Sequence, residues 1–359
     1  MEPANLRASL EGAQKEVNDE INRIFADNIE RAAKIDRCCK NLLVDMRKVM
    51  TRDNKRYWSF LACTSYAAYG GSDRKMIISA AAALEVLCAS AIVQGDVVAQ
   101  RSRRNGVANI NGIYEKRLRQ PVHPVYAQQI ANGIAQVAGN IGASVAGEQI
   151  IFIPNISSET SRMVQTIFGQ IVFEVNAGRQ FDLLLTLDNN LSLKKILKAT
   201  RYRPGAYFVG ASLRLGATLA GIDPRALARL DAAGEYIGLS YQLVEEVLNS
   251  YANARTLGMP IASDLREGKQ TALMFYGLKF ADEKQRAYLL QKHGNSKVSS
   301  DEIGQVRAIL AECGARAKTM VLAKEYSEKA RQEIDQLQAD QSALSLLRDF
   351  NEYCLERKF

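Results

Sequence analysis

The stretch MIISAAAALEVLCASAIVQGDVV, residues 76–98, decides the fold class of this chain. It has no proline, no basic residue and only two acids, Glu85 and Asp96. A run of this length could cross a membrane, but it is rich in alanine and has no flanking aromatic belt. We therefore expect a buried helix over 74–99 at the centre of a bundle. Its single terminal carboxylate, Asp96, marks either an active site or what remains of one.

Helical patterns continue through most of the 359 residues, and only 7 prolines interrupt them. The sequence predicts one all-α domain over 1–359, a helical bundle around a central cavity. We divide it into N-terminal helices (1–68), a core (69–280) and C-terminal helices (281–359). Further expectations are a basic loop over 101–125, a helix over 183–197, and two closing helices near 301–328 and 329–356.

The composition excludes several classes of function. A net charge of +8 is mild for this length; it suits an anionic ligand, and we expect no nucleic acid as partner. The six cysteines show no Cys-x-x-Cys spacing, which favours reduced thiols in a cytoplasmic protein. With two histidines, the composition disfavours a histidine-rich metal site and a Ser/His/Asp hydrolase. No signal peptide or transmembrane segment is expected.

The segment YIGLSYQLVEEVLNSY, residues 236–251, carries a second group of acids. Glu245 and Asn249 are four residues apart and lie on one helix face. Oxygen ligands suit Mg²⁺, and Mg²⁺ suits a bound diphosphate. The alternative is a solvated patch on a largely apolar helix, and the segment alone leaves both open.

Several segments, taken in order, make the sequence similar to the trans-polyprenyl diphosphate synthase family. ASDLREGKQTALMFYGL (262–278) matches the family's Asp-Leu-Arg-Glu-Gly-Lys-x-Thr loop. The others are YGGSDRK (69–75), AGRQFD (177–182), RPGAYFVGASLRLGATLAG (203–221) and GEYIGLSYQLVEEVLN (234–249). The resemblance implies an isoprenoid-synthase-type fold. It also implies Mg²⁺-assisted ionisation of an allylic diphosphate, followed by attack of isopentenyl diphosphate on the carbocation.

Two family motifs are altered in this chain. The first Asp-Asp-x-x-Asp falls on residues 95–99, where Gly95 and Ala99 replace the outer acids and Asp96 alone remains. The second falls on residues 245–249 and reads Glu-Glu-Val-Leu-Asn. Mg²⁺ affinity depends on ligand charge, so we expect weak binding or a reduced number of ions.

The resemblance assigns roles to individual residues. The catalytic set is Asp96, Gln242, Glu245 and Glu246; the diphosphate-binding set is Lys75, Arg104, Arg203 and Lys269; the weak metal set is Asp96, Glu245, Asn249 and Asp264. In the glycine-glycine segment Asp73 replaces a family arginine and would repel isopentenyl diphosphate. Small residues before the first motif, Ser90 and Ala91, would leave the substrate tunnel open to a long prenyl chain, or would allow close helix packing.

Two functions remain open on this evidence. The first is a divergent prenyltransferase or terpene-synthase-like enzyme acting on an allylic prenyl diphosphate, with impaired or absent isopentenyl diphosphate condensation. The alternative is an inactive regulatory or structural subunit that pairs with an active polyprenyl diphosphate synthase. We expect a homodimer or a heterodimer with another such synthase, and possible contact with a membrane surface through the lipid substrate.

Overall fold

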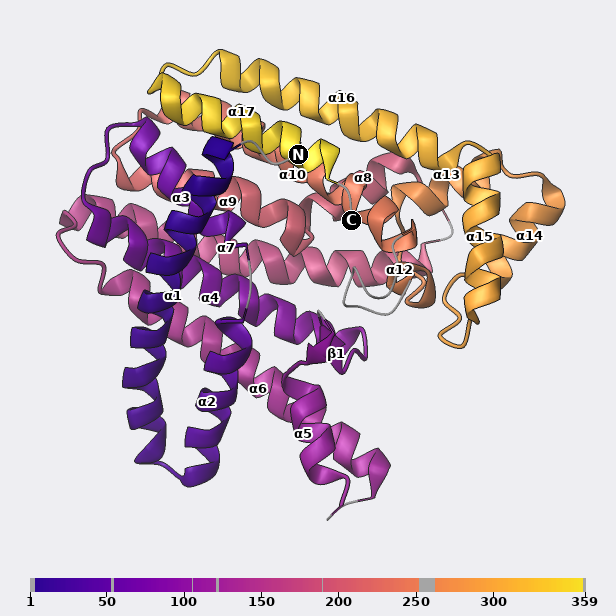
Figure 1. The fold of residues 1–359 in the computed structure, drawn as a ribbon, viewed down its shortest axis with the longest axis horizontal. Coiled ribbons are helices and arrows are strands. Elements are labelled where there is room, and N and C mark those ends of the chain that lie inside the picture. Colours follow the sequence, from indigo (N-terminus) through magenta and orange to yellow (C-terminus); the bar gives the residue numbers. More distant parts are fainter. Residues whose placement is uncertain are drawn as a thin grey trace.

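The computed structural model describes residues 4–52, 55–104, 106–120, 123–188, 190–251 and 262–357. Within these ranges the chain is almost entirely helical, which confirms the predicted all-α class (Figure 1). The helices are α1 (Ala4–Ala33), α2 (Arg37–Met50), α3 (Tyr57–Ala68), α4 (Arg74–Val98), α5 (Ile110–Leu118), α6 (Pro124–Ile151), α7 (Ser158–Leu184), α8 (Leu193–Tyr202), α9 (Pro204–Leu219), α10 (Pro224–Tyr251), α12 (Ser263–Arg266), α13 (Ala272–Phe280), α14 (Glu283–Lys292), α15 (Ser300–Glu312), α16 (Ala315–Asp335) and α17 (Gln341–Glu356). A short 3₁₀ helix, η1 (Leu185–Leu187), and an antiparallel hairpin of β1 (Arg103–Arg104) and β2 (Val107–Ala108) complete them.

The buried helix predicted from the opening stretch is α4. It begins where the Asp73 carboxylate accepts a hydrogen bond from the Met76 backbone N–H at 3.0 Å. It then runs across the bundle and ends beside β1 (Figure 1). Although α4 is long and apolar enough to span a membrane, 83% of its most apolar window is buried inside the protein. Its hydrophobic side chains are covered by α1, α3, α6 and α9, as expected of a central helix.

Small residues on α4 allow α6 to approach closely. The Ser90 hydroxyl donates to the Val86 carbonyl at 2.7 Å, and a β-carbon on Gly142 of α6 would stand 2.1 Å from that hydroxyl oxygen. Ser90 and Ala91 are both buried. Their placement supports the packing interpretation of these two residues.

A similar close approach joins α9 to α3. A β-carbon on Gly216 would lie 2.1 Å from the Ala62 carbonyl oxygen, which is rigid backbone. We therefore expect Gly216→Ala to lower the free energy of unfolding by about 1–3 kcal/mol, measured by urea denaturation. Gly12→Ala in α1 is the matched control: nothing lies within 4 Å of its β-carbon, so its stability should stay unchanged or rise. Equal effects of the two substitutions would contradict close packing at Gly216.

The basic segment 101–125 is more ordered than predicted. Gly106 has a φ of 73° and turns the chain between β1 and β2. The Asn109 side chain then accepts from the Gly112 N–H and begins α5. A short hairpin and a helix therefore replace much of the expected loop.

Three other predicted helices have different bounds: the one expected over 329–356 is divided, since α16 ends at Asp335 and α17 begins at Gln341. The helix expected over 183–197 is interrupted, because Ser192 caps a new helix, α8. The helix expected over 301–328 is divided at Gly314, whose φ of 80° lies in the left-handed region between α15 and α16. Ser192 accounts for the break within 183–197 and Gly314 for the break within 301–328.

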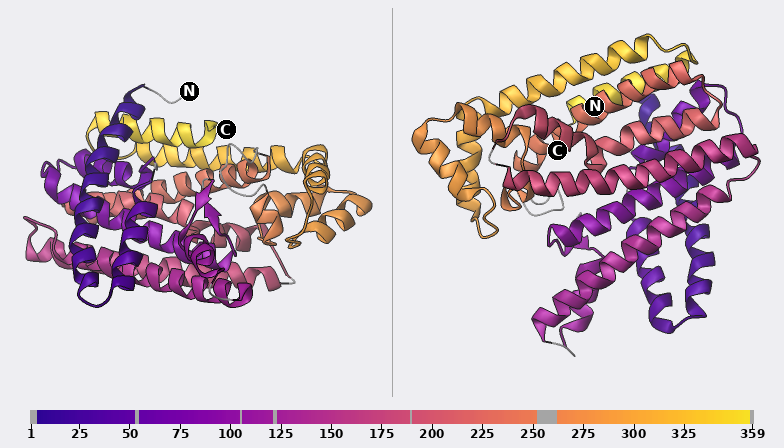
Figure 2. Two further views of the ribbon diagram at one scale, coloured as in Figure 1. Left: turned by 60° about the horizontal axis from the view of Figure 1, so that its bottom comes forward. Right: turned by 180° about the vertical axis from the view of Figure 1, so that it is seen from behind.

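The C-terminal helices are not separate from the core. α16 lies along α10, and α17 packs against α3 and α10. The α14–α15 pair stands at one end of the molecule in each view (Figures 1 and 2). The boundaries at 68 and 280 remain a prediction.

Candidate active site

The carboxylate that ends α4 is held from two sides. Asp96 Oδ1 accepts from Arg104 Nη2 at 2.6 Å, and Oδ2 accepts from Asn109 Nδ2 at 3.0 Å. Arg104 reaches it because the β1–β2 hairpin folds back over the helix end. The Asp96 side chain is only 2% exposed. Both of its oxygens therefore already have nitrogen donors.

On α10, Glu246 is buried and faces inward. Its Oε1 accepts from Arg203 Nη1 at 2.8 Å, and its Oε2 accepts from the backbone N–H of Ala272 at 2.9 Å. Burial raises the pKa of Glu246 to about 7, although Arg203 opposes the shift. Glu246 is thus a carboxyl group that can change its charge near neutral pH.

Arg203, which immediately precedes α9, is the centre of this cluster. Besides Glu246 it contacts Asp182 of α7, with Nη2 2.9 Å from Oδ1 and Nε 3.2 Å from Oδ2. The same guanidinium donates to the Gln270 carbonyl at 2.6 Å. Because Arg203 is only 5% exposed, its charge depends on both carboxylates.

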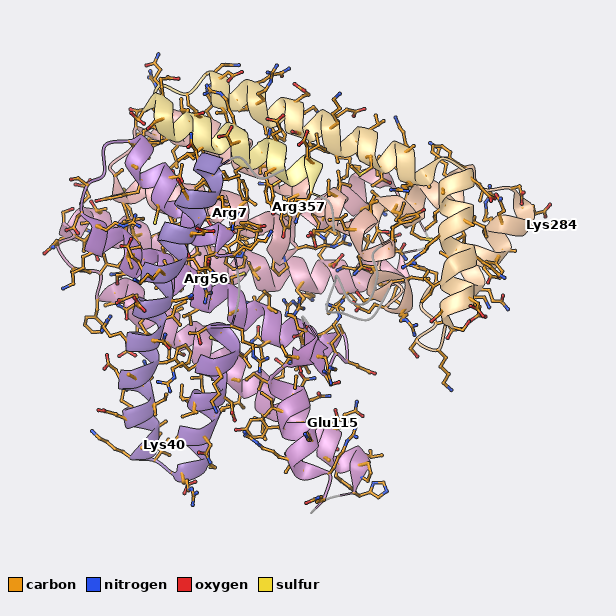
Figure 3. All side chains as sticks on the ribbon, in the orientation of Figure 1. Arg7, Lys40, Arg56, Glu115, Lys284 and Arg357 are labelled. Atoms are coloured by element: carbon orange, nitrogen blue, oxygen red, sulfur yellow. The ribbon has the colours of Figure 1, made fainter. Side chains whose placement is uncertain are left out.

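Glu245 and Gln242 point to other parts of the site. Glu245 Oε1 accepts from Arg357 Nη1 at 2.6 Å, at the end of α17 (Figure 3). The same guanidinium lies 3.8 Å from the centre of the Tyr241 ring. The Gln242 amide oxygen lies 2.6 Å from the place where a β-carbon on Gly205 would stand, in the first turn of α9. The two adjacent glutamates therefore have different partners and cannot act as a pair of ligands in this arrangement.

Asn249 links α10 to the charged loop that follows it. Its Nδ2 donates to the Ser263 hydroxyl at 2.8 Å, and its Oδ1 accepts from the Asp264 backbone N–H at 3.2 Å. The Asp264 carboxylate lies 3.5 Å from Lys269 Nζ. Arg101, from the end of α4, donates to Glu267 and to the Ser263 hydroxyl. These contacts bring the ends of α4 and α10 to the same loop.

In this arrangement the residues predicted as metal ligands are engaged by nitrogen donors. Both Asp96 oxygens, Glu245 Oε1 and Asn249 Oδ1 accept from nitrogen donors, and Asp264 Oδ1 lies 3.5 Å from the Lys269 ammonium group. Gly95 and Ala99 supply no ligand atoms. Across the ranges that the structure describes, no group of three or more His, Cys, Asp or Glu side chains is placed to hold a metal.

One predicted diphosphate ligand lies elsewhere. Lys75 is exposed in the first turn of α4, and Asp96 is in its last turn. A rise of 1.5 Å per residue puts about 30 Å between them, so they cannot contact one diphosphate. The expectation for Lys75 is therefore corrected, and Asp73, which caps the same helix end, is equally remote.

Four further charged residues belong to the site that the structure assembles. Asp182 ends the quoted AGRQFD segment, so the sequence contained a signal for it. Arg179 of the same segment approaches the end of α4. Arg101 and Arg357 had no motif of their own; only the packing of the loop and of α17 identifies them.

A small pocket lies beside this cluster. Its lining combines polar side chains, among them Asp264, Lys269 and His293, with apolar side chains of α12, α13 and α15. None of Asp96, Glu245 or Glu246 is among its lining residues. It is therefore distinct from the expected cavity between α4 and α10.

Comparisons with known proteins agree on one family. The family described as polyprenyl synthetase matches residues 40–310. The chain is 25% identical to the short chain isoprenyl diphosphate synthase of Methanocaldococcus jannaschii over 297 residues, 82% of each chain. It is 24% identical to heptaprenyl diphosphate synthase component 2 of Bacillus subtilis over 291 residues, 81% of this chain and 76% of that protein.

Solved structures agree on the fold. The geranylgeranyl pyrophosphate synthase of Corynebacterium glutamicum, complexed with isoprenyl diphosphate and magnesium, superposes with a TM-score of 0.91. The alignment covers 97% of this chain and 99% of that one at 21% identity. This likeness confirms the expected isoprenoid-synthase-type fold. Because the family match extends over three quarters of its length, the chain belongs to the polyprenyl synthetase family and is a prenyltransferase-like enzyme of isoprenoid metabolism.

Proposed function

We propose that this protein is a divergent prenyltransferase that acts on an allylic prenyl diphosphate, with impaired or absent condensation of isopentenyl diphosphate. The observation that carries the proposal is that the positive charges of Arg203 and Lys269 both act on the Asp182 and Glu246 carboxylates, while Arg104 pairs with Asp96 at the end of α4. Ionisation of an allylic diphosphate places new negative charge on the leaving group. Cations fixed in advance stabilise that charge without reorganisation.

The proposed roles follow from the contacts. Arg203 and Lys269 hold the diphosphate, and Arg104 covers its exposed edge, where its own side chain is 32% exposed. Glu246 and Asp182 orient the Arg203 guanidinium. Weak or reduced Mg²⁺ use is part of the proposal, and it is supported by the nitrogen donors that already occupy the predicted ligand oxygens.

Fewer residues support reduced use of isopentenyl diphosphate than expected from the sequence. Lys75 and Asp73 are remote from the cluster, so neither bears on it. The support that remains is the replacement of two acids of the first motif by Gly95 and Ala99. The Corynebacterium glutamicum geranylgeranyl pyrophosphate synthase, which has the same fold, was solved in complex with both isoprenyl diphosphate and magnesium. Direct assay with and without isopentenyl diphosphate separates the two substrates.

Heteromeric partnering, which the alternative of an inactive subunit requires, has one observation in its favour. Two relatives, from Bacillus subtilis and Geobacillus stearothermophilus, are named as component 2 of heptaprenyl diphosphate synthase. Large apolar side chains are also exposed along α6 and α7: Val125, Tyr126, Ile130, Val137, Ile151, Phe152, Met163, Phe173, Leu183 and Leu184. We propose this surface as a dimer interface, with a second copy or with another synthase. A cytoplasmic location, with membrane-surface contact only through the lipid substrate, fits both functions.

The test is diphosphate release by the purified chain. Incubation with Mg²⁺ and farnesyl or geranylgeranyl diphosphate, with and without isopentenyl diphosphate, is expected to release diphosphate. Lys269→Gln should reduce the rate at least about 100-fold, the scale of losing one preorganised charged group. Glu115→Gln is the control, because Glu115 is far from the cluster and pairs with Arg119 on the surface (Figure 3).

The outcomes separate the two functions. Release that is lost in Lys269→Gln and kept in Glu115→Gln supports catalysis by this chain. No turnover by the pure protein, together with co-purification of a synthase that has both Asp-rich motifs intact, supports the subunit. Mass measurement of the purified protein distinguishes a homodimer from a mixed dimer.

A further inference from the structure

The Arg179 guanidinium occupies the space beside Gly95. A β-carbon on Gly95 would lie 3.3 Å from Nη2 and 3.6 Å from both Cζ and Nη1 of Arg179. A carboxylate at position 95, which the resemblance leads one to expect, would project into the same volume. The segment Gly178-Arg179-Gln180-Phe181-Asp182 also has arginine where the family's Gly-Gln-x-x-Asp pattern has glutamine. The expected carboxylate at position 95 is therefore absent, and the Arg179 guanidinium lies in the space it would occupy.

Among the described residues, the Arg179 guanidinium has one hydrogen-bond acceptor. Nη2 donates to the Ala91 carbonyl at 2.6 Å, one turn before Gly95. Nη1 is buried and has no hydrogen-bond partner among the residues that the structure describes. A buried guanidinium nitrogen without an acceptor is costly, and an oxyanion would satisfy it.

The nearest carboxylates are committed to other cations. Asp182 is paired with Arg203, and Asp96 with Arg104. Burial lowers the pKa of Arg179, and Asp182 and Asp96 only partly offset this. Arg179 therefore carries positive charge that its surroundings leave under-compensated.

The exchange changes the local charge in one direction. Two carboxylates expected at positions 95 and 99 are absent, which contributes +2, and the arginine contributes +1, so the formal change is +2 + 1 = +3. Divalent ions are needed where carboxylates and a diphosphate must share a site. Once the carboxylates are gone, a guanidinium can bind phosphate oxygens directly.

We propose that Arg179 binds the diphosphate of the prenyl substrate directly, in the position where a metal-binding acid is expected, so that substrate binding at the end of α4 does not require Mg²⁺. This rests on the proposed function only in its choice of ligand. Arg179 is a substrate-binding residue here, and Gly95 is small because the guanidinium needs its space.

The experiment measures binding rather than turnover. Titration calorimetry with inorganic diphosphate, and then with farnesyl diphosphate, is done in EDTA and in Mg²⁺. The wild-type protein should bind in EDTA with an affinity within about tenfold of that in Mg²⁺. Arg179→Gln should weaken binding in EDTA roughly 10- to 100-fold, the range of one charge-assisted hydrogen bond. Arg179→Lys should restore part of the loss.

Gly95→Asp tests whether binding occurs beside position 95, and Arg214→Gln controls for the loss of a partly buried arginine. Gly95→Asp should neutralise Arg179, abolish binding in EDTA and make binding depend on Mg²⁺. Arg214→Gln is the matched control, because Arg214 is also partly buried and pairs with Asp231 away from the cluster. Thermal unfolding of each variant shows that it folds.

The result that overturns the inference is wild-type binding only in Mg²⁺, or equal binding by wild type and Arg179→Gln in EDTA. Binding in EDTA that Arg179→Gln removes, without diphosphate release from farnesyl diphosphate, supports the inference while contradicting the proposed catalysis. Diphosphate release from farnesyl diphosphate, together with equal binding by wild type and Arg179→Gln in EDTA, supports the proposed catalysis and contradicts the inference about Arg179.

Discussion

Arg203→Met is expected to lower the free energy of unfolding by about 3–5 kcal/mol, because it leaves two inward-facing carboxylates without their cation. Asp182 and Glu246 both depend on this guanidinium, and the Gln270 carbonyl loses its donor as well. Methionine fills a similar volume, so the loss reports charge rather than a cavity. Urea denaturation at pH 7 measures it, and diphosphate release should be lost at temperatures where the variant is still folded.

An exposed pair supplies the control for Arg203. Arg348 contacts Asp335 at 2.8 Å, and both side chains are at least one third exposed. Arg348→Met should change the unfolding free energy by less than about 1 kcal/mol. In the double variant Arg203→Met, Glu246→Leu, the loss should be smaller than the sum of the two single losses, since one unpaired carboxylate is gone. A loss below 1 kcal/mol for Arg203→Met would show that water or neighbouring groups replace the guanidinium.

The central helix could be predicted because its signal is local. A long run of apolar and small residues, without proline, has few alternatives to a buried helix. The length of this helix also determines how far Lys75 lies from Asp96. One uninterrupted helix from Arg74 to Val98 already separates Lys75 from Asp96, so the helix prediction was stronger evidence than the glycine-glycine resemblance.

The residues of the site could be predicted only in part, for the opposite reason. Spacing places Glu245 and Glu246 on adjacent helix positions but says nothing of what each one faces. Arg203 lies 43 residues before Glu246, and Arg357 lies 112 residues after Glu245. The packing of α9 and α17 against α10 brings Arg203 to Glu246 and Arg357 to Glu245. Arg179 lies in the quoted AGRQFD segment, but its role depends on the close approach to Gly95, which the sequence does not show.

Glu246 is expected to give the unfolding free energy a distinctive pH dependence. Its pKa is about 7 in the folded protein against an ordinary value of 4.5, mainly because of burial. Between these values the folded state binds more protons than the unfolded state, so stability must fall as pH rises. The contribution is fully present below pH 4.5 and is lost as pH rises through about 7. Glu246→Gln removes this titration.

The difference between wild type and Glu246→Gln isolates the effect from other titrating groups. Urea denaturation at pH 5, 6, 7 and 8 should show that the wild type loses about 1–3 kcal/mol relative to the variant across this range. Asp182 does not interfere, because Arg203 and other cations hold its pKa below 3.8 despite burial, outside the window. Glu115→Gln should follow the wild type. A constant difference would mean that the donors from Arg203 and Ala272 keep Glu246 ionised throughout. In that case the cluster would behave as a permanent ion pair, because both carboxylate oxygens would be needed as acceptors at every pH.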